Sequence, residues 1–138
     1  MSHAWQDLFE AAQAAQRRAY APYSRFLVGA AVRGPSGRVY AGCNVENAAY
    51  PAGTCAEAGA IAAMVAAGER RIVEALVIGE GEALVTPCGI CRQRLREFAA
   101  PEVPVHVVGP AGLRATFTLA ELLPHSFGPD NLGLAAPA

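Results

Sequence analysis

Apolar residues in the first twenty positions recur every three or four residues, which is the period of an amphipathic helix. They are Trp5, Leu8, Phe9, Ala12, Ala15 and Ala19. Because Pro22 cannot continue a helix, we expect this helix to cover residues 4–20. Two short apolar runs follow, at residues 26–32 and 39–42, and they flank a segment of glycine, proline and serine at 34–37. Glycine and proline supply the backbone angles of a tight turn, so this pattern predicts a β-hairpin.

The second half of the chain alternates between helical and strand patterns. The predicted elements are a helix at residues 54–67, a strand at 74–79, a helix at 89–98, a strand at 103–108, a short strand at 114–117 and a helical turn at 118–123. Strands that alternate with helices pair in parallel through crossover helices. We therefore expect an α/β fold in which the hairpin and a βαβ unit share one mixed sheet with helices on its faces.

The composition fits one folded domain with more apolar residues than its own core can bury. The chain has 138 residues, 53% hydrophobic and 17% charged, a balance that excludes an extended disordered chain. We assign residues 1–134 to a single domain and residues 135–138 to a loose C-terminal tail. The surplus of apolar residues in so small a domain favours a homo-oligomer.

Charge and targeting signals narrow the function classes further. The net charge is −1 and all eleven cationic residues are arginines, so the chain lacks the basic field that grips nucleic-acid phosphates. No apolar run is long enough to span a membrane, and the first residues lack the layout of a signal peptide. We expect a cytoplasmic protein with neither polynucleotide nor membrane partners, whose four cysteines serve thiol or metal chemistry rather than disulfides.

Two cysteine segments fall where a loop enters a predicted helix: Cys55-Ala56-Glu57 and Pro87-Cys88-Gly89-Ile90-Cys91. Helix N-termini carry unpaired N–H groups and a positive dipole end, which stabilise thiolates and so favour divalent metal binding. Cys88 and Cys91 share one face of a first helical turn, and Cys55 can supply a third sulfur from the neighbouring helix. Three ligands leave one tetrahedral position open for water, which is typical of a catalytic zinc site.

Each half of this pattern has a simpler interpretation. Cys88-x-x-Cys91 alone also fits a redox pair, half of a structural zinc site or two buried thiols. Thr54-x-x-Glu57 is a capping box, in which the carboxylate bends back to the Thr54 N–H and cannot reach the metal. Capping preferences do not predict both segments at two successive helix starts, and the combination favours catalysis.

With these segments, the chain resembles the homotetrameric class of zinc-dependent cytidine deaminases. The resemblance covers nearly the whole chain and is carried most specifically by residues 23–31, 42–54 and 127–132. It implies a three-layer α/β/α fold with one mixed five-stranded sheet, and hydrolytic deamination of cytidine and 2′-deoxycytidine to uridine and 2′-deoxyuridine in pyrimidine salvage. It also implies that Cys55, Cys88 and Cys91 bind one Zn²⁺ per subunit and that Glu57 shuttles the proton.

The resemblance further implies how a nucleoside is held. Asn44 and Glu46 match the pair that holds the ribose 3′-hydroxyl, and Phe26 matches the aromatic residue beside the pyrimidine. The backbone N–H of Ala56 and the carbonyl of Thr86 would read the edge of the base. Without the resemblance, Phe26 could equally be a core residue at the start of a strand, and Asn44 and Glu46 ordinary turn residues.

Two further positions bear on the assembly and the metal. Phe127 matches an aromatic residue that reaches into a neighbouring subunit's site, which implies shared active sites in a tetramer. Proteins of this class commonly carry an arginine directly after the catalytic glutamate, where it donates to the zinc thiolates, whereas this chain has Ala58. Either Arg92, in a segment that matches the family, or another arginine would have to disperse the thiolate charge.

The remaining candidate ligands lack metal spacing. We interpret Cys43 as a small buried apolar residue, and His106, in an apolar strand, as a core histidine with its hydrogen bonds satisfied. His3 and His125 are isolated in the sequence. Two alternative functions stay open: deamination of blasticidin S or another aminopyrimidine nucleoside, and a structural-zinc or redox module without catalysis.

Overall fold

The computed structural model describes residues 4–135, and one mixed sheet runs through its centre. The strands are β1 (Gly29–Arg33), β2 (Val39–Cys43), β3 (Glu74–Ile78), β4 (Pro104–Gly109) and β5 (Gly112–Thr118), in the spatial order β2-β1-β3-β4-β5. The α-helices are α1 (Gln6–Gln16), α2 (Ala56–Ala66), α3 (Gly89–Phe98) and α4 (Leu119–Leu122), with short 3₁₀ helices η1 (Tyr50–Ala52) and η2 (Pro129–Leu132).

The pairing of the strands confirms the predicted sheet. β1 pairs antiparallel with β2 as a hairpin, and on its other edge antiparallel with β3. β3 and β4 pair in parallel, with α3 as the crossover helix, and β4 pairs antiparallel with β5. In the hairpin turn the Gly37 N–H donates to the Gly34 carbonyl at 3.0 Å, and Gly37 adopts φ of 89°, a conformation that favours glycine.

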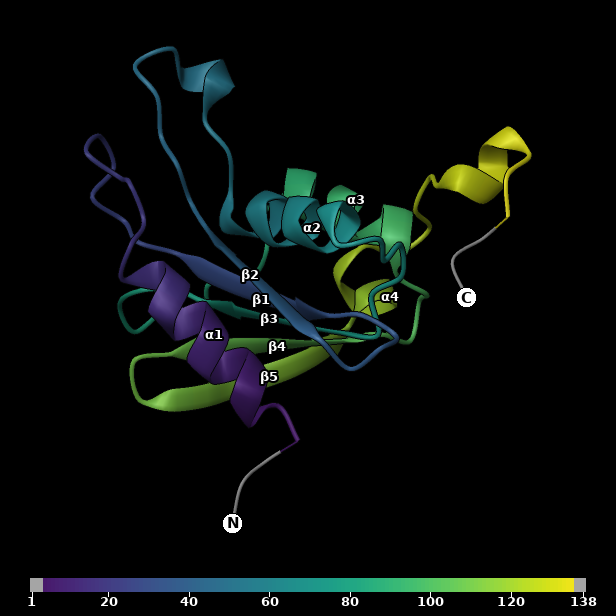
Figure 1. The fold of residues 1–138 in the computed structure, drawn as a ribbon, viewed down its shortest axis with the longest axis horizontal. Helices are drawn as coiled ribbons and strands as arrows, with labels where there is room; N and C mark the ends of the chain where they lie inside the picture. Colours follow the sequence, from purple (N-terminus) through teal and green to yellow (C-terminus); the bar gives the residue numbers. More distant parts are fainter. Residues whose placement is uncertain (1–3, 136–138) are drawn as a thin grey trace.

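Helices cover both faces of the sheet, which confirms the predicted three layers (Figure 1). On one face, Leu8 and Ala12 of α1 pack with Ala31, Leu76 and Ile78 of the central strands. On the other face, α2, α3 and α4 pack over the alternate residues of the same strands. That larger core contains Val32, Ala60, Ile61, Met64, Ala75, Leu95, Val105 and Leu119.

Two predicted helix boundaries are wrong because tertiary pairing competes with the helix. α1 ends at Gln16 rather than at residue 20, since the Tyr20 N–H donates to the Asn44 carbonyl and the Tyr20 carbonyl accepts from the Glu46 N–H. α2 begins at Ala56 rather than at residue 54, because Thr54 forms an isolated bridge with Val45.

Strand boundaries also differ from the predictions. β1 begins at Gly29 rather than at residue 26, because the Asn44 side chain takes the hydrogen bonds of Val28 and Phe26. β5 covers residues 112–118, which is longer than the predicted 114–117. Of the predicted C-terminal tail, residues 136–138 lie outside the described part of the chain.

His106 confirms the prediction of a satisfied core histidine. Its side chain lies 2.9 Å from the Thr116 hydroxyl through Nδ1 and 2.7 Å from Glu74 Oε2 through Nε2, and it is 7% exposed. Glu74 also accepts from Arg33, so the buried polar groups of this end of the sheet are paired. Over residues 4–135, no helix combines the length and apolar character that a membrane crossing requires.

Candidate metal centre and nucleoside pocket

Three cysteines from two helix starts meet at one point. Cys55 is the N-cap residue of α2 and Cys88 is the N-cap residue of α3, both with extended backbone, and Cys91 lies in the first turn of α3. The sulfur atoms of the three residues all lie within 4.8 Å of one another. The packing of α2 and α3 on the same face of the sheet therefore joins two segments that are distant in the sequence.

This donor set fits a tetrahedral zinc ion. Zinc–sulfur bonds of about 2.3 Å at tetrahedral angles hold two sulfurs about 3.8 Å apart, and the Cys55 and Cys88 sulfurs are 3.9 Å apart. None of the three is in a disulfide. Within residues 4–135, no fourth histidine, cysteine or carboxylate side chain joins this cluster, so a bound ion would keep a coordination position for another ligand.

The thiols differ in how readily they ionise. Burial raises the pKa of Cys55 and of Cys91 above the usual value for a thiol. For Cys88 burial acts in the same direction, but hydrogen bonds from the Cys91 backbone N–H and from the neighbouring thiols outweigh it, and the pKa of Cys88 is lowered. Cys88 is thus the sulfur most ready to act as a thiolate.

Glu57 is buried beside the cysteines and does not cap α2. Its side chain is in the first turn of the helix and the residue is 6% exposed. The Thr54 N–H, which a capping box would use, donates instead to the Val45 carbonyl at 2.9 Å. Burial raises the pKa of the Glu57 carboxyl, against smaller opposing effects of its own N–H, the Cys91 thiol and the Arg94 charge. The capping interpretation of Glu57 is therefore excluded.

A cavity of about 330 Å³ opens over this cluster. Eight of the predicted substrate, metal and catalytic residues line it together: Phe26, Asn44, Glu46, Cys55, Ala56, Glu57, Thr86 and Cys88. Ala56 stands at the first position of α2, where a backbone N–H has no acceptor within the helix. Phe26 is 39% exposed at the mouth of the cavity, so it is not the core residue that its strand pattern allowed.

Asn44 and Glu46 hold the wall of the cavity in place. The Asn44 side chain accepts from the Val28 N–H at 2.9 Å and donates to the Phe26 carbonyl at 2.8 Å. Glu46 Oε1 accepts from the Tyr23 and Ser24 N–H groups at 3.0 Å each, and the Ser24 hydroxyl donates to Oε2. These contacts lower the pKa of Glu46, and the hydrogen bond from the Ser24 hydroxyl has the largest effect.

Both side chains keep hydrogen-bonding capacity for a ligand. A side-chain amide has two N–H donors and two acceptor lone pairs, of which Asn44 uses one each here. A carboxylate has about four lone-pair positions, and Glu46 uses three. Each residue can thus support the cavity wall and still contact a hydroxyl group inside it.

The two arginines that follow Cys91 have different tasks. Arg92 donates to the Pro87 carbonyl at 2.7 Å, the Leu122 carbonyl at 2.8 Å and the Thr86 hydroxyl at 2.8 Å. Its hydrogen bonds therefore hold the loop before α3 in place and are not directed at the sulfurs. Arg94, which the sequence reasoning did not single out, places Nη1 3.5 Å from the Cys91 sulfur. Its signal was its position three residues after Cys91, on the same helix face.

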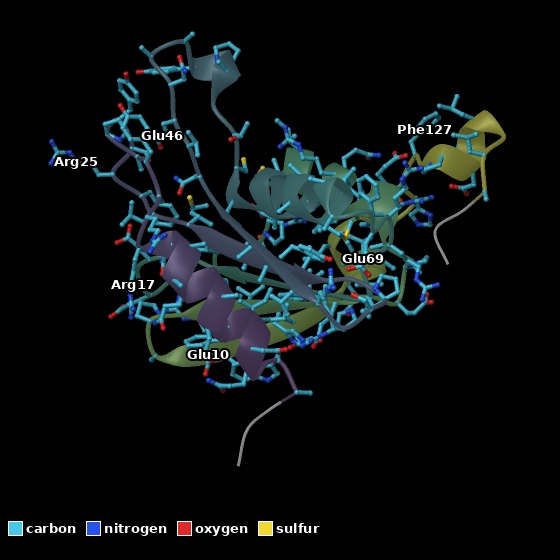
Figure 2. All side chains as sticks on the ribbon, viewed as in Figure 1. Glu10, Arg17, Arg25, Glu46, Glu69 and Phe127 are labelled. Atoms are coloured by element: carbon cyan, nitrogen blue, oxygen red, sulfur yellow. The ribbon has the colours of Figure 1, made fainter. Side chains whose placement is uncertain are left out.

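Other predicted residues lie away from the cluster. Figure 2 shows Phe127 and Glu46 at opposite ends of the molecule, and Phe127 is 59% exposed on the C-terminal segment. Cys43, at the end of β2, is half-buried rather than buried and is not among the three clustered cysteines. His125 is also outside the cluster, and His3 lies outside the described residues.

Comparison with known proteins matches this arrangement to one family. Residues 2–107 fit the family model described as the cytidine and deoxycytidylate deaminase zinc-binding region. The chain belongs to the cytidine deaminase family. It is 39% identical to a cytidine deaminase of Sporosarcina psychrophila, with 95% of this chain and 96% of the relative covered. It is 43% identical to one of Mycobacterium tuberculosis, over 93% of this chain and 92% of the relative.

Solved structures of the cytidine deaminase family have the same fold. The cytidine deaminase of Burkholderia pseudomallei superposes with a TM-score of 0.83 at 42% identity, covering 92% of this chain and all of the other. Together the comparisons confirm the predicted fold class and the predicted class of enzyme, a hydrolytic deaminase. The range matched by the family model includes all three clustered cysteines and Glu57, whereas Phe127 lies beyond that range.

Proposed function

We propose that this chain hydrolyses the exocyclic amino group of cytidine and 2′-deoxycytidine in a zinc-dependent reaction. The observation that supports it most directly is the convergence of Cys55, Cys88 and Cys91 next to a buried glutamate, in a cavity of about 330 Å³. That volume lies in the range of small-molecule pockets. The proposed role is pyrimidine salvage in the cytoplasm, a reducing compartment that keeps the thiols free to bind metal.

In this proposal one Zn²⁺ per subunit is held by the three cysteine sulfurs. When bound, zinc supplies a Lewis acid that lowers the pKa of a coordinated water toward neutrality. The two helix N-termini point their positive dipole ends at the sulfurs and stabilise them as thiolates. Because Cys55 and Cys88 are both N-cap residues, the chain directs both dipoles toward the same centre.

Glu57 is the proposed proton shuttle. Its carboxyl would take a proton from the attacking water, deliver it to N3 of the pyrimidine, and then pass the second water proton, from the new hydroxyl at C4, to the departing amine as the C4–N bond breaks. One carboxylate can serve all three steps because the reacting atoms stay within hydrogen-bond reach of it. Burial excludes bulk water from the carboxyl, so the proton it holds is passed to the substrate.

The cavity wall is proposed to orient the nucleoside. Asn44 and Glu46 would hold the ribose 3′-hydroxyl with the hydrogen-bonding capacity that the wall contacts leave free. The Ala56 N–H and the Thr86 carbonyl would read the edge of the base, and Phe26 would pack beside the ring. These contacts bind the sugar and the ring while leaving C4 directed at the metal centre.

We also propose a homotetramer in which subunits share active sites. Phe127 is exposed and lies far from Glu46 in the cavity of its own chain, which supports a role in the cavity of a neighbour (Figure 2). Several other large apolar side chains are exposed, which favours association; they include Tyr50, Ile90, Leu132 and Leu134. An apolar groove between α2 and α3, lined in part by Ile61, Ala62 and Ile90, adds to this surface.

The test is a comparison of metal-loaded and chelator-treated protein, with zinc content measured on the same samples. We expect ammonia release from cytidine and deoxycytidine only in the metal-loaded protein. Faster release from blasticidin S than from either nucleoside would instead support the alternative aminopyrimidine deaminase. A tightly held metal without any turnover, or a reversible disulfide between the cysteines, would support the structural-zinc or redox alternative and refute the proposal.

A further inference from the structure

The proposed metal centre carries a charge that its own ligands do not balance. Three thiolates around one Zn²⁺ have a formal charge of −1, and the Glu57 carboxyl is buried beside them. An anionic centre is a weaker Lewis acid, unless dipoles or hydrogen-bond donors disperse the charge on the sulfurs. Two helix N-termini contribute partial charges, and a full positive charge nearby would contribute more.

Arg94 brings such a charge to the sulfurs. Its Nη1 atom donates to the Cys91 sulfur at 3.5 Å, and Arg94 as a whole residue is half-buried. The geometry follows from α3 itself, because residues three apart on a helix lie on the same face. Across residues 4–135, none of the ion pairs within 4.0 Å involves Arg94, so no carboxylate competes for its charge at that range.

Arg94 borders the same groove as position 58. The groove lies between the two helices, with Ala58 on α2 and Arg94 on α3. The resemblance to zinc-dependent cytidine deaminases implies an arginine where this chain has Ala58. From this groove Arg94 contacts the Cys91 sulfur, and an arginine at position 58 would start from the same groove on the other helix.

We propose that Arg94 is a positioning residue that disperses the charge of the metal centre through the Cys91 sulfur, and that it replaces the arginine absent at position 58. This inference rests on the proposed function, because it requires the three cysteines to bind zinc as thiolates. Outer partners of metal ligands contribute about 10- to 100-fold to metal affinity or activity. We expect an effect of that size from Arg94.

The experiment uses the full chain loaded with zinc or with cobalt(II), in four variants. Arg94→Leu removes the positive charge and adds no atom that can bind the metal. Arg94→Lys keeps the positive charge. Ala58→Arg combined with Arg94→Leu moves the guanidinium to the other helix. Glu97→Gln is the matched control, because Glu97 lines the same groove on the same helix and Gln removes its charge. Circular dichroism and the mass of the assembly are measured for each.

The readouts are zinc affinity by chelator competition and the sulfur-to-cobalt charge-transfer band. In Arg94→Leu we expect zinc affinity to fall about 10- to 100-fold, and the band to move to lower energy because the sulfur lone pairs lose a nearby cation. Arg94→Lys should restore in part both the zinc affinity and the energy of the band. The double variant should restore both quantities more fully than Arg94→Lys does, and Glu97→Gln should match the unmodified chain.

An unchanged band and affinity in Arg94→Leu, or an equal change in Glu97→Gln, would overturn the role of Arg94. A double variant that behaves like Arg94→Leu would overturn the exchange between positions 58 and 94. If the unmodified chain fails to bind one metal ion, the proposed function itself fails, so the two failures are distinguishable.

Discussion

The backbone N–H of Thr54 donates to the Val45 carbonyl at 2.9 Å, and the Val45 N–H donates back to the Thr54 carbonyl at 3.0 Å. This pair holds Thr54 in an extended bridge and starts α2 two residues later, at Ala56. The Thr54 N–H is then not available to cap the helix with Glu57, and the Glu57 side chain faces the cysteine cluster from the first turn of the helix. A strand-like contact thus turns a potential capping residue into a buried acid.

Replacing Glu57 by Gln should keep the zinc and lower turnover by at least about 100-fold, the low end for lost general acid–base catalysis. The amide has nearly the shape of the carboxyl, so the cavity and the three sulfurs are undisturbed. Turnover is measured from the loss of absorbance as cytidine is consumed. Zinc content is measured on the same sample. A variant that turns over at nearly the rate of the unmodified chain would rule out the shuttle role.

Replacing Cys55 by Ser should abolish stoichiometric zinc binding and, with it, activity. Two of three sulfurs then remain, and a neutral hydroxyl is a poor zinc ligand. Cys43→Ser is the matched control, because Cys43 is a free, half-buried cysteine outside the cluster. Zinc content and turnover should be unchanged in the control. Loss of zinc in both variants, or in neither, would contradict the assignment of the ligands.

Replacing Glu46 by Gln should raise KM for cytidine about 10- to 100-fold with a smaller change in kcat. A hydrogen bond to a charged group contributes about 1.5–3 kcal/mol, and loss of binding shared by ground and transition states appears in KM. Ser24→Ala separates the two tasks of Glu46, since it removes the wall contacts of the Ser24 hydroxyl, with Glu46 and with the Phe26 N–H, and leaves the carboxylate. We expect a smaller rise in KM there. An equal rise in both would mean that Glu46 acts only through the wall.

Hybrid assemblies should regain activity if active sites are shared. Glu57→Gln subunits lack the proton shuttle and Phe127→Ala subunits lack the exposed aromatic side chain. Mixed by unfolding and refolding together, they form some sites with an intact Glu57 from one subunit and an intact Phe127 from its neighbour. Activity of the mixture above the average of the two separate variants is the expected result. An activity equal to that average would place Phe127 outside any active site.

Replacing Glu74 by Ala should lower the free energy of unfolding by about 2–4 kcal/mol. Glu74 accepts from Arg33 Nε at 3.1 Å and lies 2.7 Å from His106 Nε2, so its loss leaves these two poorly solvated nitrogen atoms without their partner, although Arg33 keeps Asp7 and His106 keeps Thr116. Glu10→Ala, on the exposed face of α1, is the control and should change stability little. Urea unfolding curves measure both. Equal stability of the two variants would show that the pairing contributes nothing.

Local sequence patterns predicted most of the fold correctly. The turn at residues 34–37, the buried strand β3 and the limits of α3 at Gly89–Phe98 agree with the structure. These features depend on the period of apolar residues and on glycine and proline, which act over a few neighbouring positions. The spacing of Cys88 and Cys91 belongs to the same class, because one helical turn sets their separation.

Three boundaries that differ from the predictions, the end of α1 and the starts of α2 and β1, lie where distant residues compete for backbone hydrogen bonds. Tyr20 leaves α1 to pair with the segment around Val45, and Thr54 leaves α2 for the same segment. Phe26 and Val28 are held by the Asn44 side chain instead of by β2. Propensity over a short window carries no information about such partners.

The sequence by itself determined the order of the elements, the family and the cysteine and glutamate positions at two helix starts, because each depends on residue types and short spacings. Only the tertiary structure decided that Glu57 faces the sulfurs rather than capping its helix, that Arg92 fixes a loop, and that Arg94 contacts Cys91. Those outcomes depend on how α2, α3 and the segment around Val45 pack, and packing brings together groups whose separation along the chain has no fixed period.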